Sequence, residues 1–182
     1  MLIEERRMSD KVKQFKWLIV LSLFLLAIPL YFTYNHFQQS STLKEAFEKN
    51  ERIEVLHHLM ASGRYASDIR KAGYAVPPDG AIRLDGGIDS IEIKGDIDLK
   101  ISNPGRNEVT VLFETTVKEE KIDVYYILDN QLTIKRSYYS NISNQKIKES
   151  VDISQAEEER LLKIVQKELE AFMEKMYQTL YG

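Results

Sequence analysis

The chain has 182 residues, no cysteine and a formal net charge of -3. Without cysteine, neither a disulfide nor a thiolate metal site can hold the fold together, and no lipid-carrying cysteine can serve as an anchor. The slight excess of acidic residues argues against nucleic acid as a partner.

An uncharged, strongly apolar run extends from Trp17 to Tyr34. At a rise of about 1.5 Å per residue it approaches the thickness of a hydrocarbon layer, so we predict a transmembrane helix over residues 17–36 that places the chain in a lipid bilayer. Five of the first sixteen residues are basic, which favours a cytoplasmic segment over residues 1–16 and an extracytoplasmic domain over residues 37–182. Aromatic residues at both ends of the run and the lack of a small-residue cleavage pattern favour a retained anchor over a cleaved signal peptide.

Helical periodicity follows the anchor. Thr42 and Glu45 have the spacing of a capping box, and the apolar residues behind them predict one helix over residues 43–62. A shorter helix is expected over residues 65–73. Two prolines and an Asp-Gly pair within residues 75–80 favour a break after it.

From residue 81 the apolar period changes to two, which indicates half-buried strands. We expect an antiparallel meander of four strands, with one or two shorter strands at its edge (residues 82–84 and 88–93). The four main strands are expected over residues 97–102, 109–117, 122–128 and 132–138. Turns are expected at residues 103–106, 118–121 and 129–130. The polar residues 141–150 are expected to form a loop.

Ser154 and Glu157 form a second capping box, and behind it apolar residues at helical spacing predict a long C-terminal helix. We favour packing of this stripe on the open face of the sheet; a second protein or a second copy, which would make a homodimer, is the alternative. The predicted fold is therefore α+β: one N-terminal transmembrane helix, an N-terminal helix, an antiparallel meander of four to six strands, and a long C-terminal helix packed on the sheet.

Motifs for nucleophilic catalysis, phosphate binding, dinucleotide binding or zinc proteolysis do not occur in the sequence, so we expect neither enzymatic activity nor a cofactor. His57 and His58 are adjacent and project about 100° apart on a helix, so a shared metal ion is not expected. Four aspartates within residues 85–98 lack the spacing of a calcium loop and are typical of a solvated strand face.

Tyrosines gather on the last two predicted strands of the meander. Strict alternation would turn Tyr126 and Tyr138 toward the core and bring their neighbours together on the opposite face, as an aromatic patch with basic side chains beside it. The candidate protein-binding residues are therefore Tyr125, Tyr139, Lys135 and Arg136. Cross-strand packing of these tyrosines beneath the terminal helix is the alternative.

Four segments lie in a suggestive order after the membrane span: Leu43-Lys44-Glu45-Ala46-Phe47, Gly95-Asp96-Ile97-Asp98-Leu99, Ser102-Asn103-Pro104-Gly105-Arg106 and Val109-Thr110-Val111. Over about half the chain this layout resembles the cytochrome oxidase assembly factor 1 family and the related intermembrane-space domain of the presequence translocase. The resemblance implies a membrane-anchored domain that binds another protein, as assembly factor or accessory subunit of a membrane complex. The layout also resembles small membrane-anchored immunity proteins, which implies neutralisation of a secreted bacterial toxin as the alternative function.

Overall fold

The protein is described by a computed structural model that forms two compact units, an N-terminal unit (Met1–Thr42) and a sheet domain (Leu43–Gly182). The described residues are 22, 25–31, 33, 41–77, 86–102, 105, 107–143, 146–150 and 152–182. Of residues 141–143 and 146–150 the structure describes the backbone alone.

Short helical segments begin the sheet domain: residues 43–48, α2 (Arg52–Met60), the 3₁₀ helix η1 (Gly63–Tyr65) and α3 (Ala66–Lys71). The single helix expected over residues 43–62 is wrong, because the chain turns at Asn50 with a φ of 57°. That left-handed conformation interrupts a right-handed helix, and asparagine adopts it more readily than most residues do. The second expected helix, over residues 65–73, is confirmed by η1 and α3, and it gives way to a positive φ of 90° at Gly73.

A distant residue caps the restarted helix α2. The Glu51 side chain makes no capping hydrogen bond. Instead the backbone N–H of Ile53 donates to Oδ1 of Asn130, 3.1 Å away in the loop after β4. An amide oxygen at this position satisfies one of the free N–H groups that every helix start leaves. The position of α2 is thus tied to the sheet by a contact 77 residues apart in sequence.

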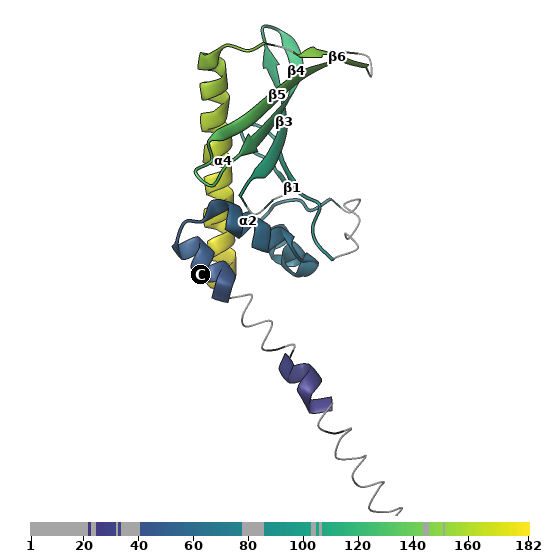
Figure 1. The fold of residues 1–182 in the computed structure, drawn as a ribbon, viewed down its shortest axis with the longest axis vertical. Helices are drawn as coiled ribbons and strands as arrows, with labels where there is room; N and C mark the ends of the chain where they lie inside the picture. Colours follow the sequence, from purple (N-terminus) through teal and green to yellow (C-terminus); the bar gives the residue numbers. More distant parts are fainter. Residues whose placement is uncertain are drawn as a thin grey trace, which may run out of the picture. The chain divides into compact units, whose positions relative to one another are not determined.

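Six strands form one antiparallel sheet in the order β1-β2-β3-β4-β5-β6, which is also their order along the chain (Figure 1). The strands are β1 (Ser90–Ile93), β2 (Leu99–Ser102), β3 (Val109–Val117), β4 (Glu120–Leu128), β5 (Ile134–Ser143) and β6 (Lys146–Ser150). The predicted meander is confirmed. The expected strand over residues 82–84, and all but Gly105 of the turn at residues 103–106, lie outside the described residues.

The loop expected over residues 141–150 is wrong, because this segment completes β5 and forms β6. Ile142 and Ile147 are Cα partners in that hairpin. The polar residues around them concealed the two-residue period from which a strand is predicted.

The connection from β4 to β5 is longer than the two-residue turn expected at residues 129–130. Oδ1 of Asp129 accepts hydrogen bonds from the backbone N–H groups of Gln131 (3.0 Å) and Thr133 (2.9 Å). Leu132 is buried at a positive φ of 57°, and its carbonyl accepts a hydrogen bond from Gln166 of the terminal helix. A longer loop, held together by the Asp129 side chain, therefore replaces the expected tight turn. By contrast, the expected turn at residues 118–121 is confirmed by two consecutive positive φ angles, 50° at Lys118 and 70° at Glu119, as type I′ hairpins require.

A bulge early in β5 reverses the predicted orientation of the residues that follow it. Ile127 pairs with Arg136, whereas Leu128 pairs with Ile134, so Lys135 is the extra residue. Successive strand residues point to opposite faces, and one extra residue exchanges the two faces for the rest of the strand. Ile134 therefore packs against the core as predicted, but Tyr138 does not.

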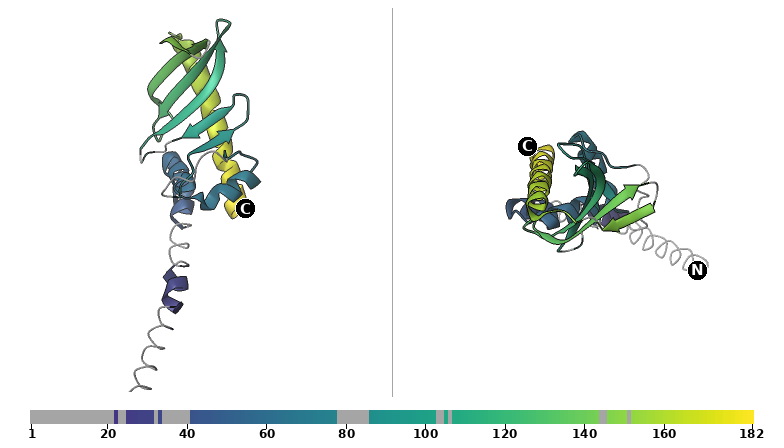
Figure 2. Two further views of the ribbon diagram at one scale, coloured as in Figure 1. Left: turned by 90° about the vertical axis from the view of Figure 1, so that its right-hand side faces the viewer. Right: turned by 90° about the horizontal axis from the view of Figure 1, so that it is seen from above.

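The helix α4 (Gln155–Tyr181) closes the core by lying along one face of the sheet (Figure 2). Its N-cap is Ser154, whose Oγ accepts from the backbone N–H of Glu157 at 3.3 Å, as the capping box predicts. The predicted stripe is buried within the chain itself: Leu161, Val165, Leu169, Phe172 and Met176 are all inaccessible. This burial confirms the favoured interpretation, in which the stripe packs on the sheet of the same chain and not against a second chain.

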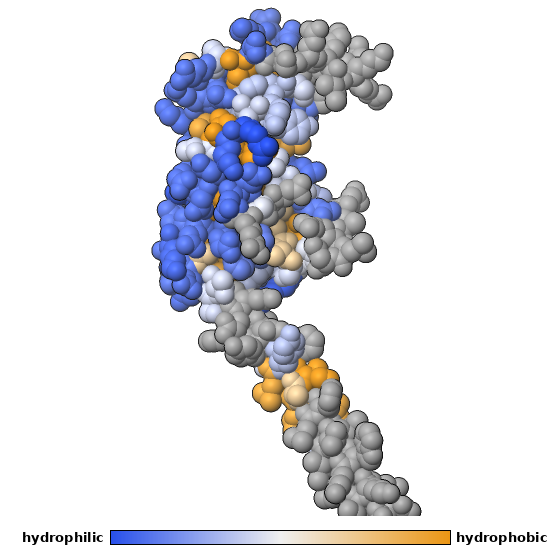
Figure 3. Space-filling model, viewed as in Figure 1, coloured by the Kyte–Doolittle hydropathy of each residue, from blue (hydrophilic) through white to orange (hydrophobic). Residues whose placement is uncertain are grey.

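The N-terminal unit contains the predicted anchor, most of which lies outside the described residues. Residues 25–31 are helical, and Leu25, Leu26, Ile28 and Leu30 expose about half or more of their surface (Figure 3). Within the described part of the chain, no helix is both long and apolar enough to cross a membrane. The span over residues 17–36 stays a prediction.

Candidate functional site

The side of the sheet that faces away from α4 carries a row of three large side chains, which we call the outer row: Leu112, Tyr125 and Tyr138. Cα pairing places Leu112 of β3 opposite Tyr125 of β4, and Tyr125 opposite Tyr138 of β5. Tyr125 is 37% exposed and Tyr138 is 55% exposed. Directly opposed side chains on one face lie within contact distance of each other, so the two rings form one exposed aromatic surface.

The structure places two of the predicted site residues on opposite faces of the sheet. Tyr125 lies on the outer face as predicted, but Tyr139 lies on the core face beneath α4. Its ring meets that of Tyr126 edge to face, with centroids 6.2 Å apart, and its hydroxyl donates to the Glu158 carboxylate of α4. The alternative interpretation, packing beneath the terminal helix, therefore holds for Tyr139, and Tyr138 takes the place beside Tyr125.

Both predicted basic residues lie on one side of the outer row, in β5 just before Tyr138, and both contact Glu108. The Lys135 ammonium is 2.9 Å and the Arg136 guanidinium 3.3 Å from this carboxylate. The hydrogen bond from Lys135, more than the charge of Arg136, holds the pKa of Glu108 below its usual range. Because two cations share one carboxylate, this side of the outer row keeps a net positive charge. Exposed ion pairs of this kind hold their partners only weakly.

Carboxylates flank the outer row on its other side. Asp123 and Glu114 are Cα partners on β4 and β3. Burial, and to a smaller extent the Glu114 carboxylate, raises the pKa of Asp123. Both residues line a hollow of about 710 Å³ that extends to Asp98 and Lys100 of the β1–β2 hairpin. The outer face therefore combines an aromatic centre with a predominantly acidic hollow.

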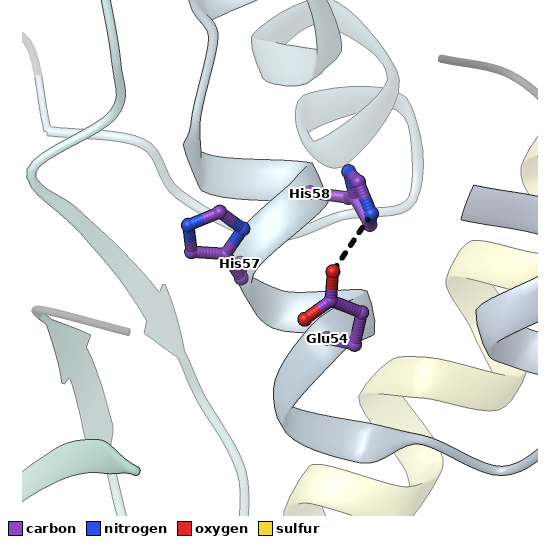
Figure 4. A group of neighbouring side chains, drawn as sticks. All are labelled: Glu54, His57 and His58. Atoms are coloured by element: carbon purple, nitrogen blue, oxygen red, sulfur yellow. Dashed lines mark ion pairs between the residues drawn. The ribbon is translucent and has the colours of Figure 1, made fainter. Parts of the chain in front are cut away.

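The two adjacent histidines of α2 have a neighbour that the sequence analysis did not consider. Glu54 precedes His57 by three residues and His58 by four, and the three side chains offer ligand atoms that lie within 4.8 Å of one another (Figure 4). The expectation that the histidines cannot contribute to one site considered only the angle between them. The spacing of three and four residues from a glutamate was the signal in the sequence that would have revealed the cluster.

Comparison with known proteins identifies no relative: no family model, curated protein or solved structure matches the chain. The resemblance to the oxidase assembly family stays a prediction. Function is therefore argued from the surface of this chain alone.

Proposed function

We propose that the sheet domain binds a protein partner through its outer face while a membrane anchor holds it at an extracytoplasmic surface, as assembly factor or accessory subunit of a membrane complex. The single observation that supports this proposal is the pairing of two exposed tyrosines, Tyr125 and Tyr138, at the centre of a sheet face. Tyrosine is among the residues most enriched at binding hot spots, because a large apolar ring and a hydroxyl are ordered at low entropic cost.

The surroundings of the outer row indicate the chemistry of the partner. The hollow beside the row is lined by Asp96, Asp98, Glu114 and Asp123, against one lysine, Lys100. The ammonium of Lys167 compensates Asp96 at 2.7 Å, which leaves an excess of negative charge. A partner that presents apolar side chains with arginine or lysine beside them would complement this surface in both polarity and charge.

The proposed anchoring is supported by the apolar surface of the N-terminal unit. Leucine and isoleucine side chains are exposed along residues 25–31, and a lipid environment is where such a surface is favourable. The basic residues ahead of it favour a cytoplasmic start and an outer sheet domain. Externally added protease should therefore remove a tag fused to Gly182 in intact cells, and a protected tag would contradict this topology.

The binding proposal is tested by capture of the partner with the full chain in a mild detergent. Tyr125→Ala combined with Tyr138→Ala should abolish recovery of the partner, while Tyr177→Ala should not. Tyr177 is a matched control, because it is as exposed as Tyr125, at 37%, but lies on α4. Equal far-UV circular dichroism of the variants would show that the sheet is intact.

Recovery of the wild-type protein alone, or equal loss in the Tyr177→Ala variant, would refute a binding role of the outer face. The identity of a captured partner separates the two functions considered. A subunit of a membrane complex agrees with an assembly role, whereas a secreted toxin indicates an immunity protein.

A further inference from the structure

A compact group of metal-ligand side chains lies on α2, outside the proposed binding surface. The group consists of Glu54, His57 and His58. We propose that these three residues bind a divalent transition-metal ion, with Zn²⁺ as the ion that fits them best. This proposal is independent of the protein-binding role of the outer face.

The helix brings the three side chains together. Residues three and four apart lie on neighbouring positions of a helix surface, so Glu54 lies one turn before both histidines and between them in direction. Figure 4 shows the Glu54 carboxylate turned toward the His58 ring, with the two imidazoles on either side of it. Nε2 of His58 is 3.1 Å from Oε1 of Glu54, and the His57 and His58 ring centroids are 5.9 Å apart at an interplanar angle of 77°.

Small side-chain rotations suffice to form a metal site from this arrangement. One ligand atom from each residue already lies within 4.8 Å of the other two. A tetrahedral ion with bonds of about 2.1 Å requires its ligand atoms to be about 3.4 Å apart. The ligand atoms therefore have to approach one another by at most about 1.4 Å, and rotation about the side-chain bonds is the movement that would bring them together.

Two atoms of the group have an unsatisfied polar function. Nδ1 of His57 and Nε2 of His58 are buried and have no hydrogen-bond partner among the residues that the structure describes, although Nε2 of His58 lies 3.1 Å from the Glu54 carboxylate. Buried polar atoms in folded proteins nearly always have a partner, because leaving one without is costly. A coordinate bond from Nδ1 to a metal ion would supply that partner.

The chemical nature of the donors selects the class of ion. Two imidazole nitrogens and one carboxylate oxygen suit Zn²⁺ and other first-row divalent metals, whereas Ca²⁺ and Mg²⁺ prefer oxygen ligands alone. Three protein ligands leave the fourth tetrahedral position of zinc open to water. The Glu-x-x-His part of the group is also the spacing with which metal-binding helix bundles present two ligands to one ion.

The test is calorimetric titration of the metal-free full chain with Zn²⁺, in detergent and with an affinity tag that contains no histidine. We expect one Zn²⁺ per chain. Each of His57→Gln, His58→Gln and Glu54→Gln should weaken binding by about tenfold or more, since even indirect partners of metal ligands contribute that much. Titration with Mg²⁺ should give no comparable binding.

Two control variants match these changes outside the group. His36→Gln removes the third histidine of the chain, which lies outside the described residues, and Glu51→Gln removes a carboxylate from the start of the same helix. Both should bind Zn²⁺ as the wild type does. Absence of binding by the wild type, or equal weakening by His36→Gln, would overturn the proposal.

A spectroscopic measurement on the wild type keeps the proposal falsifiable if a variant fails to fold. Co²⁺ bound in place of Zn²⁺ should give the intense visible absorption of a tetrahedral site with nitrogen and oxygen ligands. Addition of Zn²⁺ should remove that absorption. Weak absorption typical of hydrated, octahedral Co²⁺ would overturn the site even if some metal is retained.

Discussion

Replacing Phe172 with alanine tests whether α4 closes the core of the sheet domain. The Phe172 side chain is inaccessible to solvent, and its ring meets Tyr74 edge to face with centroids 4.8 Å apart. Removing a buried phenylalanine ring costs about 3–5 kcal/mol through lost transfer free energy and the cavity left behind. The free energy of unfolding of a whole domain is only about 5–15 kcal/mol, so this change alone should remove a large share of it.

The measurement is urea unfolding of the full chain in a mild detergent, followed by far-UV circular dichroism. With a denaturant slope of about 2 kcal/mol per molar urea, the unfolding midpoint should fall by about 2 M. Tyr177→Ala on the same helix is the control, because this residue is 37% exposed and lines an open hollow beside Phe47, so that its removal should leave no enclosed cavity. A loss below about 1 kcal/mol for Phe172→Ala would refute the closing role of α4, since only poorly enclosed positions lose so little.

Two further predictions follow from the cap of α4 and from buried phenols. Ser154→Ala removes the hydroxyl that accepts a hydrogen bond from the Glu157 N–H at 3.3 Å. It should lower the free energy of unfolding by about 1 kcal/mol, measured by thermal melts. An unchanged melting temperature would contradict the capping role. Burial raises the pKa of four tyrosine hydroxyls, those of Tyr65, Tyr74, Tyr126 and Tyr139. Because these phenols stay protonated in the folded state above the unfolded pKa of about 10, their contribution to stability is complete below that pH and is lost as pH rises through the folded values. Absorbance at 295 nm should show four tyrosines that ionise at higher pH than the exposed ones, and ionisation of all phenols at one common pH in the folded protein would contradict the effect of burial.

The parts of the fold that depend on local pattern were predictable from the sequence. The stripe of α4 and its Ser154 cap are set by residues within one helix, and the strands β3 and β4 show a period of two that is broken only at the buried Asp123. Alternation and helical spacing decide which face of such an element is buried. These elements therefore have the limits and buried faces expected of them to within a few residues.

The errors occurred where distant contacts decide local geometry. Asn130 was expected in a tight turn, but its side chain caps α2 and its loop is held by Asp129. The extra residue Lys135 then exchanges the faces of β5, so Tyr138 and not Tyr139 joins the candidate surface. No period in a single sequence marks a bulge, because its cause is the partner strand and the loop beside it.

The position of α4 after all six strands determines when the sheet domain can fold. Its buried side chains complete the same core as those of β1 to β4, and they are synthesised after all of the strands. Until α4 has been synthesised, it cannot cover the inner surface of the meander, and nascent sheets with an uncovered apolar surface aggregate readily. A premature stop before Gln155 would therefore yield a chain that quality-control proteases remove.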